Sequence, residues 1–323
     1  MRILITGAGL VGAYTARELQ ARGHAVVLYS QAIDHAYLAT VVDLARTQTV
    51  EGDVTDAAKL TETCQAHGVR ALIHTAALIG APVAREPMRG VAVNVMGSAA
   101  VAQAAHCAGV RRVVFCSSVA IYDLERLGAN EAITEDSPAG PKNLYAATKV
   151  ASEHILRQMA QLYDLELYLV RLAGVLGRGQ YAGGSWMGRK LNRVLEAGLA
   201  GRTETFKPEW IGAQEYVYVK DAAQGLALAA LTTNAPPGAY NIGLGRIHTF
   251  EDVIAEIRQA LPGLNLLVEP AGPTETYLKR SQAFDLTRAR AVLGYAPQFT
   301  FQTGLQDYLA DLRVYAGQYA RLD

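Results

Sequence analysis

Short apolar runs alternate with longer stretches of helical periodicity along the first half of the chain. The apolar runs are typical of buried strands, and they lie near residues 2–6, 25–30, 47–51, 70–75, 112–117 and 166–171. The longer stretches predict helices near residues 10–22, 56–67, 90–108 and 144–163. Strands and helices that alternate in this way form a parallel sheet covered on both faces. The pattern therefore predicts a doubly wound α/β fold.

A glycine-rich turn joins the first predicted strand to the first predicted helix. It reads Gly-Ala-Gly-Leu-Val-Gly over residues 7–12. Glycine has no Cβ, so it permits a tight turn and lets a pyrophosphate approach the backbone. The helix that follows directs free N–H groups at such an anion. This context predicts a Rossmann dinucleotide site with contacts from Gly7, Gly9, Leu10, Val11 and Gly12.

The alternation loosens after Arg171, which indicates a second, smaller region. Glycines at 174, 177, 179, 183 and 184 indicate loops, residues 185–201 have a helical pattern, and an amphipathic helix is predicted near 301–317. We expect residues 203–212 and 246–300 to build a small α/β substrate domain and residues 214–245 to return to the sheet. The predicted division is 1–172 plus about 213–245 for the Rossmann domain, and about 173–212 plus 246–323 for the substrate domain.

Two side chains on the predicted helix 144–163 indicate proton transfer. Tyr145 and Lys149 are four residues apart, so they share one helix face. A neighbouring cation favours the phenolate and lowers the pKa of a tyrosine from its usual value of about 10. Activity at neutral pH takes roughly 4 kcal/mol of such stabilisation. One exposed lysine supplies less, so further positive charge must come from burial or from a bound cofactor.

A pair of serines ends the predicted strand 112–117. Ser117 and Ser118 follow the apolar residues of this strand directly. In an open α/β sheet, ligands bind beyond the carboxyl ends of the strands. We therefore expect both serines to face the cofactor crevice and the substrate.

Together these motifs resemble the NAD-dependent epimerase/dehydratase family of extended short-chain dehydrogenases/reductases, nearly end to end. The other segments that carry the resemblance are Gly-Asp53-Val, His74-Thr-Ala-Ala, Asn94-Val-Met-Gly, Arg171-Leu-Ala-Gly-Val-Leu-Gly, Tyr216-Val-Tyr-Val-Lys-Asp, Tyr240-Asn-Ile-Gly and Leu293-Gly-Tyr-Ala-Pro. The resemblance implies that Ser118, Tyr145 and Lys149 form a catalytic triad. It adds Asn94 as a fourth, structural member.

The resemblance also implies where the cofactor binds. Asp53 would hold the adenine, and the loop after the fourth strand would lie beneath the cofactor. The implied contacts beyond the glycine turn are Ser30, Asp53, Val54, Thr75, Ala76, Ala77, Asn94, Tyr145 and Lys149. Ser30 stands where NAD-binding relatives carry an aspartate for the ribose 2′-OH. A serine still bonds that hydroxyl and does not repel a 2′-phosphate, so we expect NAD, with NADP as the alternative.

Departures from the family pattern reduce the number of candidate reactions. Val119 and Ala120 stand where related dehydratases, decarboxylases and 3,5-epimerases carry the additional acid, base or cysteine, and neither moves a proton. Nucleotide-sugar 4-epimerases need only the triad, but they hold the diphosphate with arginines. Gln214 and the segment 273–276 stand at those positions, and such residues bind a diphosphate poorly. The basic residues that could substitute are Arg178, Arg189, Lys190, Arg202, Lys207 and Arg280.

We therefore expect an NAD(P)-dependent oxidoreductase that transfers hydride at a secondary alcohol or ketone of a small sugar-like or hydroxy-acid substrate. The expected substrate contacts are Ser117, Ser118, Tyr145 and Arg178. A UDP-glucose-type 4-epimerase is the alternative. A non-catalytic, cofactor-sensing regulator is a remote one, because such proteins usually lose the tyrosine or the lysine.

Composition sets limits on partners and compartment. Thirty basic and thirty acidic residues balance, so neither a nucleic-acid nor a membrane partner is expected. The first strand begins at the initiator methionine, and the three cysteines are scattered and odd in number, so we expect a cytoplasmic protein. The histidines lack metal-ligand spacing, so no metal site is expected. Small residues on the helices of Asn94 and Tyr145 predict a homodimer, and they are Gly97, Ala100, Ala104, Ala147 and Ala151.

Overall fold

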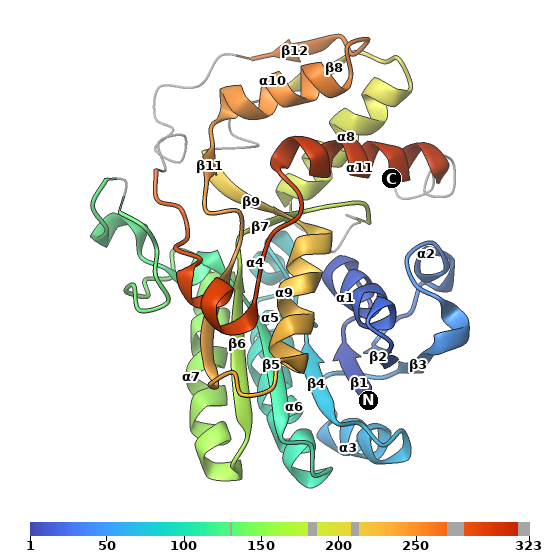
Figure 1. Cartoon of the computed structure of the whole chain (residues 1–323), viewed down its shortest axis with the longest axis vertical. Coiled ribbons are helices and arrows are strands. Elements are labelled where there is room, and N and C mark those ends of the chain that lie inside the picture. The colour runs from blue at the N-terminus through green and yellow to red at the C-terminus, as the bar shows by residue number, and fades with distance from the viewer. Residues whose placement is uncertain (130, 180–185, 208–212, 270–280, 316–323) are drawn as a thin grey trace.

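A central sheet of parallel strands forms the body of the chain (Figure 1). The computed structural model describes residues 1–129, 131–179, 186–207, 213–269 and 281–315. The sheet has seven strands in the order β10-β6-β5-β4-β1-β2-β3. Their bounds are β1 (Arg2–Thr6), β2 (Ala25–Ser30), β3 (Thr47–Glu51), β4 (Ala71–His74), β5 (Arg112–Ser118), β6 (Glu166–Leu172) and β10 (Gly238–Ile242). The six strands predicted from the apolar runs are confirmed to within one residue at each end.

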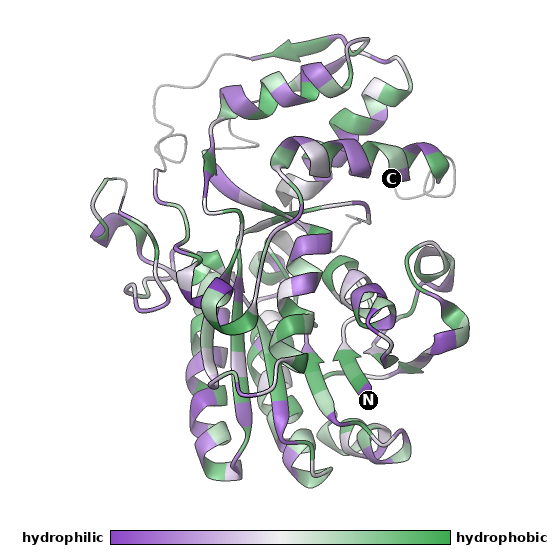
Figure 2. Cartoon of the chain, in the orientation of Figure 1, coloured by the Kyte–Doolittle hydropathy of each residue, from purple (hydrophilic) through white to green (hydrophobic). Residues whose placement is uncertain are grey.

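Helices cover both faces of this sheet, which confirms the doubly wound fold. α1 (Leu10–Ala21) and α9 (Val219–Leu231) pack together on one face, while α3 (Ala57–Ala66), α6 (Gly97–Cys107) and α7 (Leu144–Tyr163) cover the other. Successive strand residues point to opposite faces, so Ile3 and Ile5 enter the first core and Leu4 the second. In Figure 2 the central strands are accordingly hydrophobic, whereas the outer helices also carry hydrophilic stretches.

The single helix predicted over residues 90–108 is broken into pieces. α5 (Pro87–Val91) is followed by a π-helical turn (Ala92–Met96), and only then by α6. Asn94 lies within the π-helical turn and is buried. A π-helical turn contains one residue more than an α-helical hydrogen-bonded turn, and the hydrophobic periodicity of the sequence did not predict it. Such turns are frequent at functional sites. Gly97 and Ala104, two of the small residues predicted to face a second copy, are buried in this structure.

A second region lies beyond one end of the central sheet (Figure 1, top). It contains the sheet β11 (Ile247–His248), β9 (Gln214–Tyr218) and β7 (Gly174–Leu176), and the pair β12 (Leu266–Val268) and β8 (Glu204–Phe206). Its helices are α8 (Trp186–Leu199), α10 (Phe250–Ala260) and α11 (Phe301–Val314). These agree with the helices predicted near 185–201 and 301–317, of which residues 185, 316 and 317 lie outside the described ranges.

The prediction that residues 214–245 return to the central sheet is right for β10 and wrong for β9. β9 pairs with β7 and β11 instead. The buried carboxylate of Glu215 contributes to this choice, because it accepts hydrogen bonds from the backbone N–H groups of Gly245 and Phe284. Both partners are distant in sequence, so the apolar pattern of β9 did not predict them.

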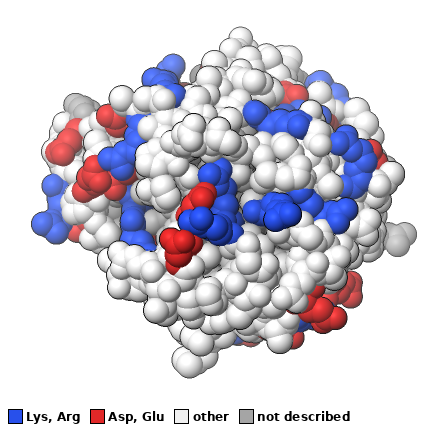
Figure 3. Space-filling view, turned by 60° about the horizontal axis from the view of Figure 1, so that its bottom comes forward, with Lys and Arg blue, Asp and Glu red and all other residues white. Residues whose placement is uncertain are grey.

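Within the residues that the structure describes, the remaining helical elements are short. They are α2 (His35–Ala39), α4 (Ala81–Arg85), three 3₁₀ turns at Leu44–Arg46, Val119–Ile121 and Leu124–Arg126, and a π-helical turn at Ala289–Leu293. Among the helices of the described ranges, none combines the length and apolar character needed to cross a membrane. Figure 3 shows basic and acidic side chains interspersed over the lower face of the molecule.

Two leucines on helices test the packing of the sheet layers. Leu226 on α9 is 0% exposed, whereas Leu162 on α7 is 74% exposed. We predict that Leu226→Ala lowers the free energy of unfolding by about 2–5 kcal/mol, because the truncation leaves a cavity against the sheet. Leu162→Ala is the control and should change it by less than about 0.5 kcal/mol. Urea denaturation measures both, and equal effects would contradict this packing.

Candidate functional site

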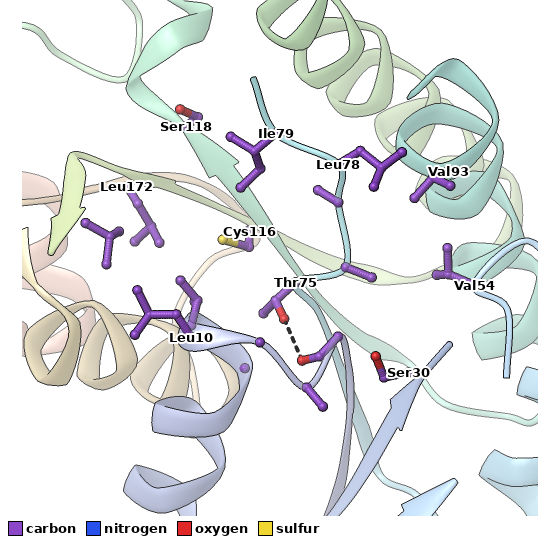
Figure 4. A pocket seen from close by; sticks show the side chains of 18 of the residues that line it. Leu10, Ser30, Val54, Thr75, Leu78, Ile79, Val93, Cys116, Ser118 and Leu172 are labelled. Carbon is purple, nitrogen blue, oxygen red and sulfur yellow. Dashed lines mark hydrogen bonds between the residues drawn. The ribbon is translucent and has the colours of Figure 1, made fainter. Parts of the chain in front are cut away.

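One cleft of about 470 Å³ opens along the carboxyl ends of the central strands (Figure 4). Its walls come from the loops that follow β1 to β4, from the end of β5, from Tyr145 on α7, and from residues 172–175. The parallel strands place all of these ends at one edge of the sheet. The predicted site residues that line the cleft are Gly7, Gly9, Leu10, Val11, Gly12, Ser30, Asp53, Val54, Thr75, Ala76, Ala77, Ser117, Ser118 and Tyr145.

The glycine turn leaves no room for a side chain. Gly7 has a φ of +87°, which favours glycine, and a Cβ on Gly12 would lie 1.9 Å from the carbonyl oxygen of Gly7. Thr75 fixes the turn, because its hydroxyl donates to the carbonyl oxygens of Thr6 and Gly7 at 2.7 and 3.2 Å. The N-cap of α1 is Gly9, so no side chain caps the first N–H groups of that helix. These groups fit a pyrophosphate, and the cleft therefore fits a dinucleotide.

The far end of the cleft carries polar groups for a nucleoside. Asp53 accepts hydrogen bonds from the backbone N–H and the hydroxyl of Thr55, at 2.9 and 2.7 Å. These bonds hold the pKa of Asp53 below its usual value, with a smaller contribution from Arg89. The hydroxyl of Tyr29 donates to the carbonyl oxygen of Asp53 at 2.9 Å and thereby fixes the loop after β3. Ser30 ends β2 at the same side of the cleft.

Asn94 supports the cleft and is not among the residues that line it. Its side-chain oxygen accepts from the N–H of Leu78 at 2.8 Å, and its amide donates to the carbonyl oxygen of Leu78 at 3.0 Å. The same amide donates to the hydroxyl of Thr148, which donates to the carbonyl oxygen of Tyr145. Asn94 therefore connects the loop after β4 to the first turn of α7. The structure does not bring it to the cofactor cleft.

Tyr145 occupies the first turn of α7. The helix begins there because the side chain of Asn143 accepts the N–H of Ala146 at 2.9 Å. Burial raises the pKa of Tyr145, and the neighbouring Cys116 adds to the rise, whereas a hydrogen bond from Ser118 lowers it. The requirement for further positive charge, recognised from the sequence, therefore stands.

Lys149 lies below Tyr145 and also outside the lining of the cleft. Its ammonium group is buried, donates to the carbonyl oxygen of Cys116 at 2.7 Å, and is 5.9 Å from the centroid of the Tyr145 ring. Burial lowers the pKa of Lys149, while Cys116 and Glu153 act in the opposite direction. The ammonium group thus shares the helix face of Tyr145, as the four-residue spacing predicts.

The two serines at the end of β5 point to different places. The hydroxyl of Ser118 accepts the N–H of Ala120 at 3.2 Å at the edge of the cleft. The hydroxyl of Ser117 donates to Glu153 at 2.6 Å and is buried. Side chains alternate along a strand, so only one of two neighbours faces a given side. The hydroxyl of Ser117 is therefore engaged by Glu153, although Ser117 is among the residues that line the cleft, and its contact with substrate stays a prediction.

Arg178, an expected substrate contact, lies outside this cleft. Its guanidinium is buried, 4.3 Å from the centroid of the Tyr315 ring, and it donates to the carbonyl oxygen of Thr40 at 3.2 Å. Asp311 lies 3.8 Å from its Nε. These contacts hold the side chain between α2 and α11, and Arg178 is not among the residues that line the cleft. All three partners are distant in sequence, so no local signal revealed them.

Several lining residues were not predicted from the sequence. They are Ala8, Tyr29, Gln31, Gly52, Leu78, Ile79, Arg89, Val93, Cys116, Val119, Leu172, Ala173, Gly174, Val175 and Gly179. Leu78 and Ile79 continue the predicted loop after the fourth strand, so extending that motif by two residues finds them. The segment 172–175 directly follows Arg171, and it was predicted only as part of a family marker.

Comparisons with known proteins agree with this geometry. The model of the NAD dependent epimerase/dehydratase family matches residues 3–243. A UDP-glucose 4-epimerase from Mycolicibacterium smegmatis is 33% identical over 94% of this chain and 96% of its own.

Two solved structures resemble the whole chain. The UDP-glucose 4-epimerase of Thermus thermophilus in complex with NAD is 28% identical, with a TM-score of 0.83 over 97% of this chain and 99% of that chain. DesIV, a dTDP-glucose 4,6-dehydratase from Streptomyces venezuelae with NAD and TYD bound, is 26% identical, with a TM-score of 0.82 over 100% of both chains.

Gly12→Ala tests the glycine turn. We predict that it weakens NAD binding at least tenfold, or by about 1.4 kcal/mol, because the new Cβ displaces the carbonyl of Gly7 from the turn. Gly238→Ala is a matched control, since a Cβ on Gly238 meets nothing within 4 Å. Isothermal titration measures both affinities. An affinity of Gly12→Ala within twofold of the unmodified chain would contradict the assignment.

Proposed function

The chain belongs to the NAD-dependent epimerase/dehydratase family, and we propose that it transfers hydride between NAD and a secondary alcohol or ketone of a small sugar-like or hydroxy-acid substrate. It is an NAD-dependent enzyme, as its relatives are. The observation that carries the proposal is the pair of hydroxyls of Ser118 and Tyr145, which stand in one cleft with the glycine turn.

Each member of the triad has a distinct task in this proposal. Tyr145 takes the proton from the substrate alcohol, or returns it to the ketone. Ser118 hydrogen-bonds the same oxygen and holds it against Tyr145. Lys149 supplies positive charge on the same helix face and binds the nicotinamide ribose. NAD supplies the hydride acceptor and, when oxidised, a further positive charge that favours the phenolate.

The charge of the cleft supports a substrate without a diphosphate. Of the lining residues that the structure describes, only Arg89 is a lysine or arginine. It lies close enough to Asp53 to lower the pKa of that carboxyl. Arg89 therefore belongs to the end of the cleft that is assigned to the nucleoside. The guanidinium of Arg178 is packed between aromatic rings. Bidentate guanidinium contacts usually dominate the binding of the diphosphate of a nucleotide-sugar substrate, whereas the wall beside Ser118 includes the apolar side chains of Val119 and Leu172.

A nucleotide-sugar 4-epimerase is the second candidate, and the comparisons favour it. The relative from Mycolicibacterium smegmatis and the structure from Thermus thermophilus are both UDP-glucose 4-epimerases that match nearly the whole chain. An epimerase would use the same three side chains. Arg280 and the segment 273–276, which bear on diphosphate binding, lie outside the described residues. Dehydration is not proposed despite the likeness to DesIV, because Val119 and Ala120 offer no acid or base beside Ser118.

The fate of the cofactor separates the two candidates. We would denature freshly purified protein and measure the released NAD by chromatography. Little bound NAD supports an exchanging dehydrogenase, and NAD reduction should then appear with members of a panel of polyols, sugars and hydroxy acids. Near-stoichiometric NAD, together with conversion of UDP-glucose to UDP-galactose, would replace the first candidate with the second.

Tyr145→Phe tests the proton-transfer step in either case. We predict that it abolishes turnover and leaves NAD affinity nearly unchanged, because only the phenolic hydroxyl is removed. Tyr163→Phe, on the last residue of the same helix, is the control and should retain full activity. A Tyr145→Phe enzyme that keeps more than about a tenth of kcat, a barrier rise below about 1.4 kcal/mol, would refute the role.

A further inference from the structure

Three consecutive residues at the end of β5 each meet one residue of α7. The three residues of α7 are spaced by four, so they lie on one face of the helix. The pairs are Cys116 with Lys149, Ser117 with Glu153, and Ser118 with Tyr145. The first and third pairs belong to the site described above. The second, which has no part in the proposed mechanism, connects the same two elements.

Glu153 is the centre of a buried ion pair. Its Oε1 accepts from the hydroxyl of Ser117 at 2.6 Å and from Nε of Arg171 at 3.0 Å, and its Oε2 accepts from Nη2 of Arg171 at 2.7 Å. Glu153 is 4% exposed and Arg171 6%. Burial alone raises the pKa of Glu153, but the hydrogen bonds from Arg171 and Ser117 bring it below its usual value. Glu153 is therefore held as a carboxylate.

Arg171 extends the network across the sheet. Its Nη1 donates to the hydroxyl of Tyr122 at 2.8 Å and to the carbonyl oxygen of Glu135 at 2.6 Å. The hydroxyl of Tyr122 in turn donates to Asn241 at 2.7 Å. The network thus joins α7, β5, β6 and β10 directly below the edge that carries the cleft. A buried network of this kind specifies one arrangement of its elements, because any shift leaves charges unpaired.

We propose that Glu153 is a positioning residue, which with Ser117 and Arg171 clamps the end of β5 against α7 and so fixes Ser118 relative to Tyr145 and Lys149. The clamp acts through the register of two elements, and Glu153 itself does not line the cleft. This inference rests on the proposed function for the roles of Ser118, Tyr145 and Lys149.

The carboxylate also acts on the charge of Lys149. The ionisable groups that influence or face Lys149 are Cys116 on β5, His74 on β4, and Tyr145 and Glu153 on α7. Of these, Glu153 is held as an anion, and an anion favours the protonated form of a lysine. Loss of its charge lowers the pKa of Lys149 further, so Lys149 loses its proton at a lower pH.

The test compares Glu153→Gln with a control variant, Glu166→Gln, which removes an ion pair at the other end of β5 and β6. Arg112 on β5 donates to Glu166 on β6 at 3.0 and 2.8 Å, and Glu166→Gln removes that pair. Hydrogen exchange of residues 112–122 reports the clamp in the full chain. NADH fluorescence, titrated between neutral and alkaline pH after charcoal removes bound cofactor, reports the charge of Lys149.

Glu153→Gln should speed exchange at residues 116–121 by about tenfold and move the alkaline loss of NADH binding to lower pH. Glu153→Asp, which keeps the charge, should restore the pH dependence. Glu166→Gln should change neither readout. Glu153→Gln that folds with unchanged exchange and unchanged pH dependence would overturn the proposal.

Removing one partner of a buried ion pair is strongly destabilising, so Glu153→Gln can fail to fold. Ser117→Ala then decides, because it removes the strand-to-helix hydrogen bond and keeps the ion pair. Faster exchange at residues 116–121 in Ser117→Ala supports the clamp, and unchanged exchange refutes it. Hydrogen exchange needs no substrate or cofactor. A chain that binds no NADH would therefore refute the proposed function and still allow the clamp to be judged.

Discussion

The parallel direction of all seven central strands is the constraint on which the site depends. Because the strands run the same way, the residues that end β1, β2, β4 and β5 meet at one edge. The glycine turn after β1 can then close directly onto Thr75 after β4. A cleft assembled from strand ends inherits the rigidity of the sheet, since each end is fixed by hydrogen bonds to its neighbours.

The elements that could be predicted are those whose cause is local. The apolar runs fix the strands, and the missing Cβ at Gly7 and Gly12 fixes the turn, so both follow from a few neighbouring residues. The shared face of Tyr145 and Lys149 follows from helix geometry alone.

The features that could not be predicted depend on contacts between distant segments. β9 has the pattern of a central strand, but its partners are β7 and β11. The guanidinium of Arg178 lies near Asp311 and over the ring of Tyr315, which are both more than a hundred residues away in the sequence. The hydroxyl of Ser117 is bound by Glu153 on α7, and the sequence did not tell which of the two neighbouring serine hydroxyls would be engaged there.

Two ionisable side chains of the site, Lys149 and Tyr145, lie where their charged forms are disfavoured. Burial disfavours the charged form of Lys149 and the ionised form of Tyr145, and within the described ranges neither group has a charged partner in direct hydrogen-bond contact. A buried lysine is costly unless nearby groups compensate for lost water. Here the carbonyl of Cys116 and the charge of Glu153 compensate in part.

The raised pKa of Tyr145 has a consequence for both candidate reactions. A tyrosine with a raised pKa accepts a proton poorly until positive charge arrives beside it. In the proposed mechanism, proton transfer by Tyr145 is therefore coupled to the presence of the oxidised cofactor, whichever substrate is bound. A dehydrogenase must exchange its cofactor after each turnover, because hydride transfer leaves it in the other oxidation state, whereas an epimerase must keep the cofactor through two hydride transfers. The triad is common to both, so the distinction lies in how firmly the cleft holds the dinucleotide and in the walls that surround the substrate.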